Sequence, residues 1–316
     1  MNIKIMISFV LSCAAAFSAV TSGCSQESTG SDQKLITKES LLENAVLTFT
    51  DTGSLDMDVK ADLDLSVVAR GFDIALNNKC ESNIIVHKNG SSHYKGEMIV
   101  SAAGTETKLG LEGYHKTDGN DATDYTKLSA NGNEGSWIRS VSESEKENSA
   151  VSGSGGAYKM GLIRVLNVYD KFKENITDLN LAEDTVSYNG TDCYLVSGRL
   201  TGDNLADLVR TVYPDNPYMI EKNDFSKISL DTMLYFRSSD EIPYALELDL
   251  RDTVRNMIIP HSGDISVFDI SSDKMLMTVL FNEYSKAEEM SVPDDIKNNA
   301  QLSVDTFDIQ NLLLGV

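Results

Sequence analysis

The chain has 316 residues, with 27 Lys and Arg against 48 Asp and Glu, which gives a formal net charge of −21 at pH 7. Such acidity argues against a nucleic-acid partner, because phosphates are neutralised by Lys and Arg. It also argues against a protein body that lies flat on an anionic membrane.

The first 24 residues have the layout of an export signal. Lys4 supplies the positive charge, an apolar stretch runs from Ile5 to Val20, and small residues lead to Cys24. This layout resembles a bacterial lipoprotein signal, in which the cysteine thiol is acylated and becomes the new N-terminus. We therefore expect a signal peptide over residues 1–23 and a lipid on Cys24. The protein would be exported and anchored on the extracytoplasmic face of the cell membrane.

Other interpretations of this segment stay open. Cys13 is a poorer lipidation site, because cleavage there would leave a very short apolar segment. A plain secretory signal could be cleaved after Ala19 or Gly23. A membrane-spanning anchor needs roughly 20 apolar residues, and this run has about 16. Residues 24–35 are polar and typical of a flexible tether, which favours a lipid anchor.

A short amphipathic helix is expected to open the folded domain. Thr37 is a candidate N-cap, and Leu42, Ala45 and Phe49 follow at helical spacing before Asp51-Thr52-Gly53 ends the pattern.

The clearest periodicity follows this helix. Apolar and polar residues alternate strictly from Leu55 to Val67, which predicts a long strand with one buried face and one wet face. A strand of this length is typical of a large antiparallel sheet. Further strands are predicted at 71–76, 84–86, 98–100, 108–115, 137–138, 186–200, 228–236, 244–250, 267–270 and 275–284.

Two more helices are predicted between the strands. One has an apolar stripe over 158–172, and the other follows Thr201, with Leu205 and Leu208 on one face. Residues 140–156 are rich in Ser, Glu and Gly and indicate a loop. We predict an α+β fold, with a large curved antiparallel sheet packed around a few amphipathic helices. Residues 36–316 would form one domain, as a single body or as two lobes divided at 140–156.

No familiar chemical motif stands out. The chain lacks a nucleophile elbow, a phosphate loop and the common zinc patterns. We interpret residues 118–124 as a polar hairpin turn. His87, His93, His115 and His261 do not cluster, and we interpret them as surface imidazoles. We therefore expect no catalytic residue, no metal and no cofactor.

Two further cysteines, Cys80 and Cys193, lie near the ends of predicted strands. Outside the cytoplasm such a pair can oxidise. The sequence leaves a disulfide and two separate buried thiols equally open, because it does not fix the distance between their Cα atoms.

The order of these features resembles the half-open β-barrel lipoproteins of the LolA/LolB and LppX/LprG type, with their uncharacterised relatives in Gram-positive bacteria. The resemblance covers most of 35–300. It rests on the lipidated cysteine, the tether, the order of helices and strands, and phrases such as Tyr188–Gly198 and Val292-Pro293-Asp294-Asp295. It implies a curved sheet that wraps around helices and leaves an apolar cavity for acyl chains.

The apolar faces of the predicted strands would line such a cavity. The candidate lining residues are Leu55, Met57, Val59, Leu63, Leu65, Leu230, Leu234, Phe236, Leu246 and Leu248. We therefore expect an envelope lipoprotein that binds or carries a lipid or another apolar molecule. One alternative is a structural or sensory surface lipoprotein with a closed core and a protein partner. A weaker alternative is a hydrolase with dispersed catalytic residues.

Overall fold

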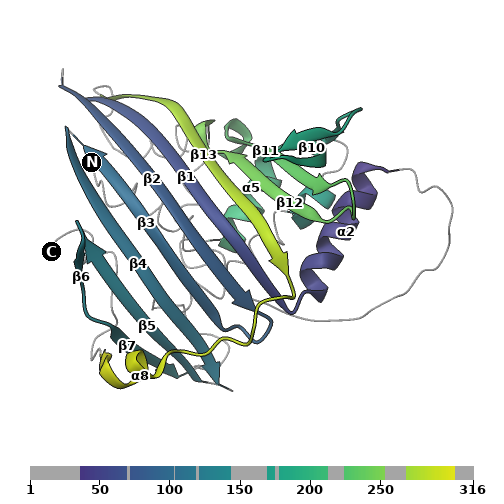
Figure 1. Ribbon diagram of the computed structural model, residues 1–316. Coiled ribbons are helices and arrows are strands. Elements are labelled where there is room, and N and C mark those ends of the chain that lie inside the picture. Colours follow the sequence, from purple (N-terminus) through teal and green to yellow (C-terminus); the bar gives the residue numbers. More distant parts are fainter. Residues whose placement is uncertain are drawn as a thin grey trace.

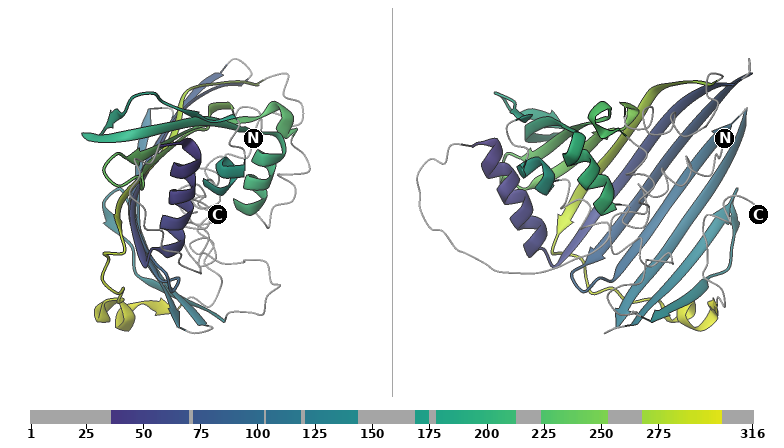
Figure 2. Two further views of the ribbon diagram at one scale, coloured as in Figure 1. Left: turned by 90° about the vertical axis from the view of Figure 1, so that its right-hand side faces the viewer. Right: turned by 180° about the vertical axis from the view of Figure 1, so that it is seen from behind.

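One long, curved sheet dominates the protein (Figure 1). The computed structural model describes residues 36–69, 72–102, 104–118, 121–143, 169–174, 178–212, 224–252 and 268–302. Helices α2 (Lys38–Asp51) and α5 (Gly202–Val212) lie on the concave side of the sheet (Figure 2). The fold is the α+β half-barrel that the sequence predicts. We call the concave side the inner face and the convex side the outer face.

Helix α2 begins where the sequence provides a cap. The side chain of Thr37 accepts a hydrogen bond from Ser40 N, and Ser40 Oγ accepts one from Thr37 N, each at 3.1 Å. This capping box satisfies two N–H groups that otherwise lack intrahelical partners. The helix buries one face, made of Leu41, Leu42, Ala45 and Phe49. It ends at Asp51, so the predicted first helix is confirmed.

The first half of the sheet is a meander of long antiparallel strands. These are β1 (Ser54–Ala69), β2 (Phe72–His87), β3 (Ser92–Ala102), β4 (Thr105–Asp118) and β5 (Asp121–Ala130). In β1 the predicted alternation holds, because Leu55, Met57 and Val59 are buried on the inner face while Asp56 and Asp58 lie on the outer face.

The sequence-based strand boundaries are wrong in three places. The separate strands predicted at 71–76 and 84–86 are parts of the single strand β2. Likewise, the strands predicted at 267–270 and 275–284 are parts of the single strand β13 (Phe268–Tyr284). Strand β5 is not predicted at all, since its first residues are polar and resemble a turn. In each case the neighbouring strands supply backbone partners that local patterns do not reveal.

Strand β13 joins the two halves of the sheet. It pairs antiparallel with β1 on one side and with β12 (Pro243–Asp249) on the other. Beyond β12 lie β11 (Ser229–Arg237), β10 (Thr191–Thr201) and β8 (Asn180–Leu181). The 3-10 helix η2 (Phe225–Lys227) precedes β11. The strands on either side of residues 140–156 therefore share one sheet, in the order β14-β7-β5-β4-β3-β2-β1-β13-β12-β11-β10-β8.

Two tight turns explain the short flanking strands. Strand β9 (Val186–Tyr188) folds onto β10 through Asn189 and Gly190, whose φ values are 49° and 81°. Strand β6 (Asn133–Glu134) folds onto β5 through Asn131 and Gly132, with φ values of 50° and 81°. Positive φ at both central positions is the geometry that Asn-Gly hairpins favour.

The C-terminal part of the described chain crosses to the far edge of the sheet. Helix α8 (Asp294–Asn299) is followed by β14 (Gln301–Leu302), which pairs with β7 (Ile138–Glu143). Among the described strands this pairing alone is parallel, and it covers part of an edge strand. On the outer face, Ile296 and Val292 pack in one cluster with Tyr125.

Candidate functional site

The residues predicted to line a cavity lie on the inner face. Those with described side chains are all buried: Leu55, Met57, Val59 and Leu63 on β1, Leu230, Leu234 and Phe236 on β11, and Leu246 and Leu248 on β12. Leu65 is also on β1, and its side chain lies outside the described part of the structure.

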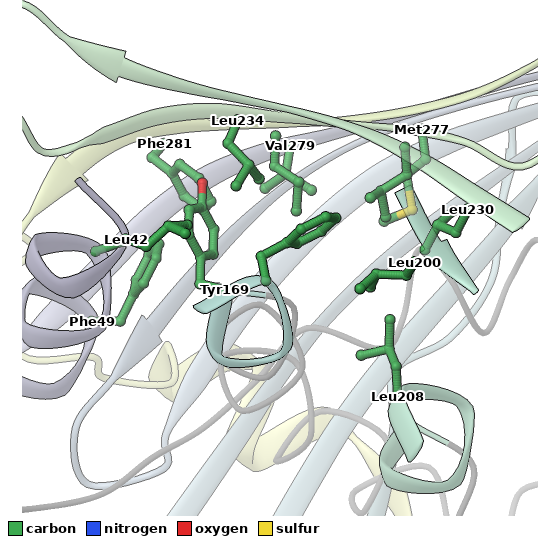
Figure 3. Close-up of a cluster of buried hydrophobic side chains, with 14 of the residues drawn as sticks. Leu42, Phe49, Tyr169, Leu200, Leu208, Leu230, Leu234, Met277, Val279 and Phe281 are labelled. Carbon is green, nitrogen blue, oxygen red and sulfur yellow. The ribbon is translucent and has the colours of Figure 1, made fainter. Parts of the chain in front are cut away.

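At the β10–β13 end of the sheet, helices fill the inner face. Phe49 of α2 meets Phe281 of β13 with ring centroids 5.1 Å apart, and it meets Tyr169 at 5.2 Å. Leu208 of α5 lies toward Leu200 and Leu230 (Figure 3). The helical residues 169–174 insert Tyr169 and Phe172 between these elements, and both are fully buried. The inner face of β10–β13 is therefore a closed hydrophobic core.

The inner face continues beyond this core. Figure 2 shows α2 and α5 over one end of the sheet, and no helix of the described ranges lies over the inner face of β3–β5. A second apolar cluster begins here, with Cys80 and Met98 buried and Ala61, Val100 and Leu109 half-buried. Register pairs Ala61 with Cys80, Cys80 with Met98, and Met98 with Leu109 across four strands. We call these five residues the inner cluster.

Farther along β3–β5, side chains on the same face are polar. They are Ser92, Tyr94, His115, Asp124 and Thr126, all buried, and we call them the polar corner. His115 Nδ1 and Asp124 Oδ1 are 2.7 Å apart, and Tyr94 Oη and Thr126 Oγ1 are 3.2 Å apart. The interpretation of His115 as a surface imidazole is thus wrong, because only 1% of its side chain is exposed.

The other predicted surface histidines differ from one another. His93 is half-buried on the outer face, where it stacks on Tyr114 with ring centroids 4.4 Å apart. Burial lowers the pKa of His93, and the nearby Glu112 opposes this shift. His87 is buried at the end of β2, and burial lowers its pKa as well. His261 lies outside the described residues.

Ser, His and Asp in one row resemble the residue set of a serine hydrolase. Register places Ser92 opposite His115, and His115 opposite Asp124. However, Ser92 Oγ makes no hydrogen bond to a described residue, whereas a catalytic triad is defined by a hydrogen bond between the nucleophile and the base.

Cys80 and Cys193 are both free thiols in this structure. Cys80 lies in the middle of β2 on the inner face, whereas Cys193 lies near the start of β10 in an outer-face cluster with Tyr235 and Ala245. Four strands separate β2 from β10, which is about 24 Å along the sheet. A disulfide needs Cα atoms within about 7 Å. Burial raises the pKa of each thiol to about 11.

The outer face is the wet side that the sequence predicts. Asn83 donates hydrogen bonds to Asp56 and Asp58, at 2.8 and 3.0 Å, and Lys274 pairs with Asp62. Within the described ranges, no group of three or more His, Cys, Asp or Glu could hold a metal ion. None of the described helices is both long and apolar enough to cross a bilayer. Cys24 and the signal segment lie outside the described residues.

Comparison with known proteins finds similarity only to solved structures, at low sequence identity. No protein-family model and no curated protein matches it. The solved structures that it resembles include LprF from Mycobacterium bovis, at 11% identity and a TM-score of 0.39, over 81% of this chain and 95% of LprF. A β-barrel-like DUF1849 protein from Brucella abortus matches at 13% identity and a TM-score of 0.24, over 73% of this chain and 97% of that one.

A third match is a DUF1329 family protein from Desulfovibrio piger, at 10% identity and a TM-score of 0.20, over 80% of this chain and 93% of that one.

Proposed function

We propose that the chain is a lipoprotein, anchored through a lipid on Cys24, that binds or carries a lipid or another apolar molecule on the inner face of β1–β5. The observation that carries this proposal is the inner cluster. It extends the apolar inner face past the region that the described helices fill, and Ala61, Val100 and Leu109 in it stay half-buried. Covering apolar surface of this kind is favourable by roughly 25 cal/mol per Å².

The polar tether supports a role at the membrane. Residues 24–35 are mostly polar, with three Ser and two Gln, and a flexible segment of this length would have an r.m.s. end-to-end distance of about 20 Å. Such a tether would keep the domain within reach of the bilayer surface, where an apolar ligand can enter and leave without crossing much water.

The anchor is tested in cells that express the full chain. With a clickable fatty acid in the medium, we expect labelled protein in the membrane fraction. Cys24→Ala should lose both the label and the membrane association, while the matched variant Cys13→Ala keeps both. A Cys24→Ala protein that still carries the label would refute the anchor.

The ligand is tested on the full chain in its own membrane. Cells are fed a fatty acid with a photoreactive diazirine, irradiated, and the cross-linked peptides of the purified chain are mapped. We expect cross-links on β2–β4 peptides at inner-face positions. Ala61→Trp, which fills the middle of the inner cluster, should remove them. Ala75→Trp makes the same change at an exposed outer-face position and should leave them intact.

The closed core at β10–β13 favours the alternative of a surface lipoprotein with a protein partner. If the β2–β5 end is also filled by the chain itself, Ala61→Trp overpacks it and costs about 1–3 kcal/mol of stability. Cross-links confined to the peptide that contains Cys24, together with such a loss of stability, would overturn the proposed ligand site.

A further inference from the structure

The polar corner forms two adjacent rows on the inner face. Ser92, His115 and Asp124 lie opposite one another on β3, β4 and β5. In the next row, Tyr94 and Thr126 flank Gly113, and the Tyr94 ring lies over that glycine, where a Cβ would collide with it. The corner is thus built by three strands, at the end of the inner face where β3 begins and away from the inner cluster.

One hydroxyl in this corner has no partner among the described residues. Ser92 is 0% exposed, and its Oγ makes no hydrogen bond within the described ranges. An unpaired buried hydroxyl costs roughly 1–3 kcal/mol, and folded proteins leave few such groups without a reason. A bound molecule that offers a hydrogen-bonding group here would remove this cost.

The charges around the corner restrict the chemistry of that molecule. Lys60, Lys79, Lys95, Lys108, Lys116 and Lys127 all occupy outer-face register positions. On the described inner face of β1–β5, the ionisable acid and base side chains are Asp124 and His115, which bond to each other. Among the described residues of this face, an anionic group would meet the Asp124 carboxylate and no lysine or arginine. A buried charge without a partner is costly.

We propose that the polar corner binds the uncharged, hydroxyl-bearing head of an amphiphile with an acyl chain, of the monoacylglycerol type. This inference rests on the proposed function, because the chain of the ligand would lie along the inner cluster. Ser92 and Met98 are six residues apart on β3, which is about 20 Å along the strand. The two acyl layers of a bilayer make a hydrocarbon core of about 30 Å, so one extended acyl chain is about 15 Å long and fits this distance.

The test compares two photoreactive probes that carry the same acyl group. Each is added to the full-length protein in detergent micelles. One is a monoacylglycerol and the other is the corresponding fatty acid, which is anionic. We expect stronger labelling of inner-face peptides by the monoacylglycerol. Ser92→Ala should reduce that labelling roughly fivefold, or about 1 kcal/mol, the effect of one hydrogen bond. It should leave labelling by the fatty acid unchanged.

Ser92→Ala is a suitable variant, because the hydroxyl that it removes has no hydrogen-bond partner among the described residues. Ser82→Ala is its matched control, since Ser82 Oγ is also buried and unpartnered on the inner face but lies outside the polar corner. Equal labelling by both probes, or no effect of Ser92→Ala, would overturn the inference while the proposed function stands. Labelling by neither probe would remove both.

Discussion

Gly113 is the position where the arrangement of the polar corner can be tested most directly. It faces inward on β4 between Tyr94 and Thr126, and a Cβ there would lie 2.7 Å from Tyr94 Cε1 and closer still to the end of the ring. Carbon atoms pack at about 3.5–4.0 Å, so the ring must move by roughly 1 Å. Tyr94 is buried and its hydroxyl is 3.2 Å from Thr126 Oγ1, so little space is available for such a movement.

We expect Gly113→Ala to lower the free energy of unfolding by about 2–4 kcal/mol. Overpacking in a buried site accounts for about 1–3 kcal/mol of this loss, and the disturbed hydrogen bond between Tyr94 and Thr126 adds about 1 kcal/mol. The measurement is urea unfolding monitored by circular dichroism. If the dependence of the unfolding free energy on urea concentration has the same slope in both proteins, the shift of the midpoint reports the change in stability.

Gly110→Ala is the matched control on the same strand. Gly110 faces outward, and the group that a new Cβ would meet is the hydroxyl of Ser129, whose own Cβ is 3.7 Å away. The Ser129 side chain can rotate into another rotamer, so we expect a change within about 0.5 kcal/mol. Equal losses in Gly113→Ala and Gly110→Ala would refute the placement of the Tyr94 ring over β4.

Three further predictions concern other parts of the fold. Gly198→Ala should destabilise the core by about 1–3 kcal/mol and so lower the thermal midpoint of unfolding. The new Cβ would collide with Leu179 and lie 3.2 Å from Phe172 Cε1. An unchanged midpoint would contradict that packing. Burial lowers the pKa of His93 in the folded state, so the unfolded chain binds the proton more readily and stability falls as the pH drops through about 6.5. The stability difference between wild type and His93→Gln should therefore shift in favour of His93→Gln between pH 7 and pH 5, and a shift in the other direction would count against it. When the protein is denatured without reductant, alkylation should label the peptides of both Cys80 and Cys193. In the folded protein both thiols should react slowly, because burial raises the pKa of each to about 11. Peptides that stay unlabelled after denaturation would reveal a disulfide.

Local sequence patterns predict the parts of this fold that are locally determined. The cap at Thr37 and the spacing of Leu42, Ala45 and Phe49 define α2 without reference to the rest of the chain. The alternation from Leu55 to Val67 defines β1 in the same way, because in this range each inward residue is apolar and each outward one is polar. Asn189-Gly190 defines its hairpin, since few other residue pairs accept two positive φ values.

The patterns fail where the inner face itself is polar. In β2 the inward positions include Asn78 and Ser82, and in β5 they include Asp124 and Thr126. A strand whose buried face carries such residues shows no apolar alternation, so the middle of β2 is missed and β5 resembles a turn. The polar corner was likewise out of reach, because it is assembled from three strands whose register no local motif specifies.

These failures fall together at one end of the sheet. At the β10–β13 end, the inward residues are large and apolar, among them Leu234, Phe236 and Phe281, and helices pack against them. At the β2–β5 end, several inward residues are small or polar, and a protein that needed only stability would gain by replacing them with apolar ones. Sequences depart from such local rules mainly at functional or strained sites. The departure lies at the β2–β5 end rather than in the packed core, and this is the end at which we propose that a ligand binds.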